Sequence, residues 1–268
     1  MRRRVPFVPR PSAPRLWVRR RPDREELWTE TTGEPPAVYG ERWESDGARA
    51  LRSFEPARSK LAAALVRVWD GPLPQPGERW LYLGAASGTT ASHVADLLGP
   101  SGRLYAVERS ARPFARLLRL AERWSNLLPI LGDAHAPERY ADRVPLVDGI
   151  YADVAQPDQG ALLLANAEVF LRDDGGAFVL ALKTSSMGRG ISAPAHLKAT
   201  EAALGPTFDL EAAVRLDPFY RSHYLLGGRR SGSPRTPPAG RPVPGDREMR
   251  RGPKFSSRRG PRPGRSRS

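Results

Sequence analysis

The pattern of apolar and polar positions divides the chain into two folded parts with polar ends. Between residues 14 and 55, turn-rich stretches separate short β-type segments, which predicts a small antiparallel sheet. From residue 78 onward, short apolar segments alternate with segments of helical periodicity, and this alternation is typical of βαβ units in a mostly parallel sheet. The sequence therefore predicts a small β subdomain followed by an α/β domain over residues 56–228.

The predicted elements follow directly from these periodicities. In the subdomain, β-type segments fall at 16–18, 27–29, 37–39 and 48–54. In the α/β domain, strands are expected at 80–83, 103–107, 127–131, 147–152, 177–182, 208–216 and 222–226. Helices are expected at 59–69, 89–98, 113–124, 157–171 and 194–204.

Charge is distributed unevenly along the chain, whose formal net charge is +14. Residues 1–24 hold nine arginines against one aspartate, and residues 229–268 hold thirteen basic residues against two acids. Both ends are also rich in proline, so we expect 1–13 and 229–268 to be disordered. Two basic ends around a mildly acidic body favour a polyanionic partner such as nucleic acid, although solubilising tails would have the same composition.

Several classes of protein are excluded by what the sequence lacks. It has no cysteine, which excludes disulfide scaffolds, thiolate metal sites and cysteine nucleophiles. No apolar run approaches the length of a membrane span, and the Arg- and Pro-rich start does not resemble a secretory signal, so we expect a cytoplasmic protein that does not bind membranes. The four histidines are too scattered to predict a metal site.

One loop and three acids point to a ligand site at the carboxyl edge of the predicted parallel sheet. The loop 83–90 around Gly84 is rich in small residues, which lets a ligand approach the backbone and a helix N-terminus. Glu108, Asp133 and Asp153 each follow a predicted strand. Such a row of acids suits a positively charged nucleoside such as a sulfonium, whereas hydride cofactors favour a phosphate-binding glycine motif. A tight turn and solvated strand-end charges are the alternative interpretation.

Four segments resemble the fibrillarin family, and the archaeal fibrillarin-like rRNA/tRNA 2′-O-methyltransferases in particular. They are RSKLAAAL (58–65), LYLGAASGTTASHVADLLGPSGRLYAVERS (81–110), NLLPILGDAHAPERY (126–140) and DGIYADVAQPDQ (148–159). VYGE (38–41) and DPF (217–219) are similar to that family too, so the resemblance spans about residues 14–228. The basic C-terminal segment is not part of the usual archaeal pattern.

The resemblance implies a Rossmann-like class I methyltransferase that uses S-adenosyl-L-methionine (AdoMet) to methylate ribose 2′-hydroxyls in rRNA or tRNA. It also implies a ribonucleoprotein in which a coiled-coil Nop-type scaffold protein and a kink-turn-binding protein place the enzyme on box C/D guide RNA, and the guide selects the nucleotide. The alternative is a non-catalytic RNA-binding or assembly protein that keeps the methyltransferase fold.

Residue by residue, the resemblance implies two sets of side chains. The first would contact AdoMet and comprises Gly84, Thr89, Thr90, Glu108, Arg109, Asp133, Ala134, Asp153, Val154, Ala155 and Gln156. Arg109 departs from the family, in which an aromatic residue is common there. The second set would be catalytic and comprises Lys60, Asp153 and Lys183, with His223 or Asp217 as a fourth member.

The body of the chain uses lysine sparingly, and this supports the catalytic set. Its only lysines are Lys60, Lys183 and Lys198, although it holds many arginines. Lysine can lose its proton in a suitable environment, whereas arginine effectively cannot. We therefore predict that Lys183 accepts the proton from the ribose. Asp153 would orient Lys183, and Lys60 would orient the ribose. Without the resemblance, both lysines would be interpreted as surface charges.

Overall fold

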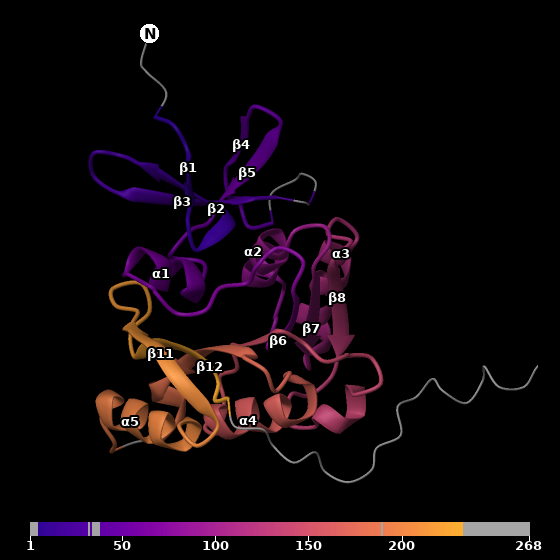
Figure 1. The fold of residues 1–268 in the computed structure, drawn as a ribbon, viewed down its shortest axis with the longest axis vertical. Coiled ribbons are helices and arrows are strands. Elements are labelled where there is room, and N and C mark those ends of the chain that lie inside the picture. Colours follow the sequence, from indigo (N-terminus) through magenta and orange to yellow (C-terminus); the bar gives the residue numbers. More distant parts are fainter. Residues whose placement is uncertain (1–4, 32, 34–37, 189, 233–268) are drawn as a thin grey trace, which may run out of the picture. The chain divides into compact units, whose positions relative to one another are not determined.

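The computed structural model describes residues 5–31, 33, 38–188 and 190–232, all of which belong to one compact unit, residues 1–233. This unit contains two sheets, one with five strands and one with seven (Figure 1). Most of the basic C-terminal segment predicted to be disordered, from residue 233 on, lies outside the described residues, as do residues 1–4. No helix in the described ranges is long and apolar enough to cross a membrane.

The five-stranded sheet is antiparallel throughout, as the N-terminal pattern predicts. Its order is β1-β2-β3-β5-β4. The strands are β1 (Val8–Arg10), β2 (Ala13–Arg20), β3 (Glu25–Glu30), β4 (Trp43–Asp46) and β5 (Arg49–Ser53).

Two expectations for the N-terminal part are wrong. Strand β1 lies inside the segment 1–13 expected to be disordered, because it pairs with β2 and the ring of Phe7 packs edge-on against Trp28 at 5.2 Å. Residues 38 and 39, expected to form a strand, lie in a loop instead. In that loop the Glu41 carboxylate accepts the backbone N–H groups of Val38 and Tyr39, each at 2.9 Å.

The seven-stranded sheet has the order β11-β12-β10-β9-β6-β7-β8. Its strands are β6 (Arg79–Leu83), β7 (Arg103–Glu108), β8 (Leu127–Leu131), β9 (Gly149–Ala152), β10 (Ala177–Lys183), β11 (Phe208–Arg215) and β12 (His223–Arg230). Strands β6 to β10 are mutually parallel, and β12 is antiparallel to both of its neighbours. The prediction of a mostly parallel α/β sheet is confirmed. Strand β12 continues to Arg230, beyond the strand expected at 222–226, so residues 229 and 230 are ordered by pairing with β10 and β11 and the expectation of disorder from 229 is wrong there.

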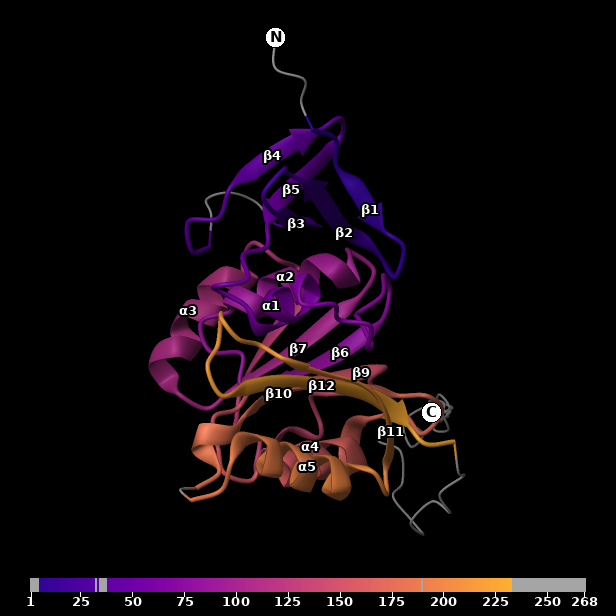
Figure 2. The same ribbon diagram turned by 90° about the vertical axis from the view of Figure 1, so that its left-hand side faces the viewer.

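Helices cover both faces of this sheet. They are α1 (Lys60–Val66), α2 (Thr89–Leu98), α3 (Ala111–Ala121), α4 (Gln159–Phe170) and α5 (Ala193–Leu204). Figures 1 and 2 show α1 and α2 between the two sheets, and α4 and α5 on the opposite face of the seven-stranded sheet. Strand β6 serves both layers, because Trp80 and Tyr82 pack in the core on the α1 and α2 side while Leu81 and Leu83 pack in the core that includes α4.

A buried polar network joins the small sheet to α2. Asp96 of α2 accepts hydrogen bonds from the hydroxyls of Thr29 and Thr31, each at 2.9 Å. It also accepts bonds from the Arg52 guanidinium and the Trp124 indole N–H, each at 2.8 Å. The side chains of Arg52 and Asp96 are fully buried. This network fixes α2, and with it the loop that leads into α2 from β6.

Candidate active site

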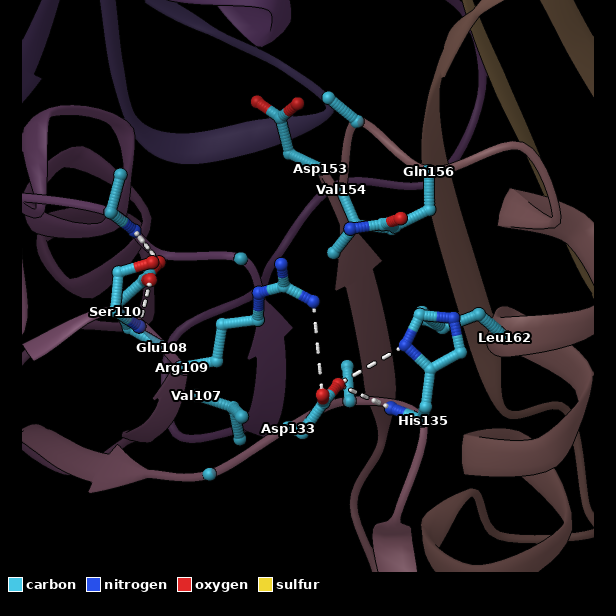
Figure 3. Close-up of a pocket in the computed structure, with 15 residues that line it drawn as sticks. Val107, Glu108, Arg109, Ser110, Asp133, His135, Asp153, Val154, Gln156 and Leu162 are labelled. Atoms are coloured by element: carbon cyan, nitrogen blue, oxygen red, sulfur yellow. Dashed lines mark hydrogen bonds and ion pairs between the residues drawn. The ribbon is translucent and has the colours of Figure 1, made fainter. Parts of the chain in front are cut away.

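A cavity of about 200 Å³ opens at the carboxyl ends of β6, β7, β8 and β9 (Figure 3). The chain order reverses between the neighbouring strands β6 and β9, and ligands of open α/β sheets bind at such a switch point. Most of the predicted cofactor residues line this cavity, namely Gly84, Glu108, Arg109, Asp133, Ala134, Asp153, Val154, Ala155 and Gln156.

Glu108 ends β7 and its carboxylate shapes one wall of the cavity. One oxygen accepts the backbone N–H of Ala86 at 2.9 Å, and the other accepts the N–H of Ser110 at 2.7 Å. Both bonds join Glu108 to the loops that start α2 and α3 (Figure 3). Each carboxylate oxygen has a second lone pair, so the group can still accept hydrogen bonds from the hydroxyls of a ribose.

Gly84 permits the close approach of two strand ends. Its φ angle is +79°, and a Cβ at this position would lie 2.4 Å from the backbone oxygen of Asp153. Only glycine combines this backbone conformation with this contact. The loop after β6 therefore lies directly against the segment after β9 that carries Asp153.

His135 lies between two carboxylates at the edge of the cavity away from Glu108. The Asp133 carboxylate accepts the backbone N–H of His135 at 3.0 Å and lies 3.1 Å from its ring Nδ1. The Nε2 atom lies 3.2 Å from both carboxylate oxygens of Asp158, at the start of α4. These carboxylates raise the pKa of His135, and the contacts with His135 lower the pKa of Asp133. In Figure 3 Asp133 and His135 lie well below the Asp153 carboxylate, on another side of the cavity.

Two predicted cofactor residues do not line this cavity. Thr90 is buried and donates a hydrogen bond to the hydroxyl of Ser59 at 3.1 Å. Ser59 is the N-cap of α1, so Thr90 supports the turn that presents Lys60. Thr89 lines a second hollow, formed with side chains of α3.

The predicted pair of Lys60 and Asp153 forms an ion pair. The Lys60 Nζ atom lies 2.7 and 2.9 Å from the two oxygens of Asp153, and both side chains are about four-fifths buried, with exposures of 19% and 21%. The same amine lies 5.5 Å from the ring centre of Tyr220, a cation–π contact that sequence reasoning missed. Asp153 therefore binds Lys60, and not Lys183 as expected.

Lys183 is held through its backbone by one buried side chain. The carboxamide oxygen of Gln159 accepts the N–H of Lys183 at 2.8 Å, and its NH₂ group donates to the carbonyl oxygen of Lys183 at 3.1 Å. Gln159 is fully buried at the start of α4. The amine of Lys183 has no ion pair among the described residues. Gln159 ends the sequence DVAQPDQ, yet its role is visible only in the structure.

His223 completes the cluster beside Lys183. The two residues are register partners on the antiparallel strands β10 and β12. Burial, together with the positive charges of Lys60 and Lys183, lowers the pKa of His223, while the charge of Asp153 opposes this shift. Because carbonyl oxygens only accept, Nδ1 donates its proton to the Arg221 carbonyl at 2.8 Å. The alternative fourth residue, Asp217, is paired with Arg215 at 2.7 Å.

The arrangement fits a bound nucleoside next to a proton-transfer site. The cavity offers carboxylates for ribose hydroxyls and an adenine edge, and Gly84 exposes backbone to it without a side chain. Beside it lie Lys60, which is paired with Asp153, and Lys183, which has no carboxylate partner in the described part of the chain. His223, whose pKa is lowered, lies next to Lys183. The four predicted catalytic residues therefore lie close enough together that the charges of Lys60, Asp153 and Lys183 all act on His223.

Comparison with known proteins is consistent across sequence and structure. Residues 9–231 match the protein family Fibrillarin. A relative from Aeropyrum pernix, named fibrillarin-like rRNA/tRNA 2′-O-methyltransferase, is 42% identical over 190 residues, which cover 70% of this chain and 81% of that protein.

Two solved structures are similar over most of the chain. The first is A. pernix fibrillarin with natively bound S-adenosyl-L-methionine, with a TM-score of 0.75, 37% identity and coverage of 84% of this chain and 98% of that one. The second is a fibrillarin/Nop5p complex, with a TM-score of 0.70, 38% identity and coverage of 76% and 94%.

Proposed function

Because this chain belongs to the fibrillarin family, we propose that it transfers the methyl group of AdoMet to ribose 2′-hydroxyls of rRNA or tRNA. The observation that carries the proposal is the Lys60–Asp153 ion pair beside the cavity at the carboxyl ends of β6 to β9, together with the neighbouring Lys183 and His223. Relatives named as 2′-O-methyltransferases, and one solved with AdoMet bound, support both the reaction and the cofactor. A fold kept only for assembly would not need this set of ionisable groups.

The side chains divide the chemistry among them. AdoMet supplies an electrophilic methyl group, and the ribose hydroxyl must be placed in line with it and relieved of its proton. Lys60 is engaged by Asp153 and so presents a fixed positive charge that can orient the ribose oxygens. Lys183, which lacks such a partner in the described ranges, is the group positioned to accept the proton. His223 donates through Nδ1 to a backbone carbonyl, which leaves Nε2 as an acceptor.

The partners follow the same family. The fibrillarin/Nop5p complex supports a Nop-type scaffold protein as a partner of this chain. We further propose that box C/D guide RNA and a kink-turn-binding protein complete the particle, because the sequence resembles enzymes that are recruited in this way. The basic ends of the chain would add affinity for RNA that does not depend on the guide.

Reconstitution tests the proposed reaction. The full chain, combined with box C/D guide RNA, a Nop-type scaffold protein, a kink-turn-binding protein and tritiated AdoMet, is expected to label one ribose of the target RNA, at the position that the guide specifies. Mapping of 2′-O-methyl groups gives the readout. AdoMet binding in calorimetry without any transfer of label to RNA would instead identify an assembly protein.

The carboxylate of Glu108 is expected to contribute strongly to cofactor affinity. Hydrogen bonds to a charged acceptor are worth about 1.5–3 kcal/mol, so Glu108→Gln should weaken AdoMet binding by about tenfold to a hundredfold. Isothermal titration calorimetry measures this change. Glu211→Gln, which removes an acid of the surface strand β11, is the matched control and should bind AdoMet as the parent does. Equal affinities for the two variants would remove Glu108 from the cofactor site.

A further inference from the structure

Helix α3 carries a row of arginines along one side. Arg112, Arg116, Arg119 and Arg123 follow one another at intervals of four, three and four residues, which places them on one face of a helix that continues into its C-terminal turn. Leu117 and Leu120, which lie outside this row, are buried against the rest of the domain. At a rise of about 1.5 Å per residue, neighbouring arginines are offset along the axis by roughly 4.5–6 Å.

The first three arginines of this row are not neutralised by acids of the described residues. In the part of the chain that the structure describes, Arg112, Arg116 and Arg119 make no ion pair. The arginines of the small sheet behave differently, since Arg15, Arg19 and others pair with Glu30, Glu44 and neighbouring carboxylates. Arginines of the small sheet thus have acidic partners, whereas Arg112, Arg116 and Arg119 have none among the residues that the structure describes.

The row borders a hollow of about 580 Å³. Arg116 and Arg119 line it from α3, and Arg58 lines it from the segment before α1. Tyr39 and the hydroxyl-bearing Thr89 also line it, and Glu122 is its one acidic side chain among the described residues. The hollow therefore combines several positive charges with an aromatic ring, and the Arg58 guanidinium lies 5.5 Å from the centre of that ring.

Arg58 links the lining of the hollow to the catalytic lysine along the chain. Arg58 lies two residues before Lys60, and Ser59 between them is fixed by the hydrogen bond from Thr90. The charge of Arg58 acts on Tyr220, whose ring lies against the Lys60 amine. Arg58, which lines the hollow, is thus separated from the Lys60–Asp153 pair by a single residue of the chain.

We propose that this arginine face, formed by Arg112, Arg116 and Arg119 together with Arg58, binds the sugar–phosphate backbone of the RNA on its way to the active site. The inference rests on the proposed function and adds a binding surface within the folded domain, separate from the basic ends of the chain. Guanidinium groups bind phosphate in a bidentate geometry, and their spacing on a helix face matches a ladder of anionic groups. Because phosphates carry no sequence information, this contact positions the RNA without selecting the nucleotide.

The test compares two triple variants of the full chain that have the same net charge. Arg112→Gln/Arg116→Gln/Arg119→Gln alters the α3 face, and Arg67→Gln/Arg139→Gln/Arg143→Gln alters three exposed arginines elsewhere. Binding of a short single-stranded RNA of mixed sequence is measured over a range of KCl concentrations. Each lost phosphate contact lowers the slope of log K against log salt by about 0.7, so the α3 variant should lose about 2 units of slope, and the control should lose much less.

Equal slopes for the two variants would overturn the proposal. So would an α3 variant that binds RNA like the parent but loses affinity for polyglutamate, because that result would assign the surface to an acidic protein. AdoMet affinity, measured in parallel, should be unchanged in both variants and shows that each is folded. The measurement needs no turnover, so failure of the parent to methylate RNA would count against the proposed function and not against this surface.

Discussion

Lys183→Ala is expected to lower the rate of methyl transfer by about 10²- to 10⁴-fold, the contribution of a positioned general base. The affinity for AdoMet should change little, because Lys183 does not line the cavity at the ends of β6 to β9. Single-turnover transfer of tritium to guided RNA measures the first quantity, and calorimetry measures the second. Loss of both together would indicate a damaged fold.

Two further lysine variants sharpen this result. Lys183→Arg keeps the positive charge but cannot release a proton, so it should be as inactive as the alanine variant if the amine acts as a base. Lys198→Ala, in the exposed part of α5, is the matched control and should turn over like the parent. Substantial activity in Lys183→Arg would mean that the residue acts through its charge, and the proton acceptor would have to be His223 or solvent.

Asp96→Ala is expected to lower the free energy of unfolding by about 3–5 kcal/mol, the usual cost of removing one partner from a buried ion pair. The Arg52 guanidinium would lose a buried carboxylate, and the Thr29, Thr31 and Trp124 donors would lose their acceptor. Urea unfolding followed by circular dichroism measures the change. Asp96→Asn, which keeps the shape and one acceptor, should lose less and serves if the alanine variant does not fold.

An exposed ion pair of the small sheet provides the control for the Asp96 variant. Asp46 and Arg49 lie 3.9 Å apart with about half of each side chain exposed, and exposed pairs contribute about 0–1 kcal/mol. Asp46→Ala should therefore leave the urea midpoint nearly unchanged. A loss below 1 kcal/mol for Asp96→Ala would show that the junction between the small sheet and α2 does not depend on this network.

Periodicity and motif spacing were sufficient to predict the seven-stranded sheet and the edge that carries the cavity. Strand β6 directs large apolar residues to both faces of the sheet, and acids lie at the end of β7 and after β8 and β9. These features depend on local sequence, so they are visible without the structure. Most of the predicted cofactor residues share one cavity because the carboxyl ends of parallel strands meet at one edge.

Features that depend on contacts between distant residues were not predictable. Strand β1 forms in an Arg- and Pro-rich segment only because β2 supplies its hydrogen bonds and Trp28 supplies a packing surface. Nothing in the sequence shows that Asp153 binds Lys60 instead of Lys183, since the choice is set by where α1 begins relative to β9. The hydrogen bond from the Thr90 hydroxyl to Ser59 also depends on where α1 begins and is not visible in the sequence.

The first turn of α4 touches both ends of the active site through consecutive residues. Asp158 contacts His135 beside Asp133, and Gln159 holds the backbone of Lys183. A displacement of this turn by a fraction of an ångström would therefore move the nucleoside-side cluster and the basic amine together. Inserting a single residue between positions 158 and 159 would prevent Asp158 from contacting His135 while Gln159 holds Lys183.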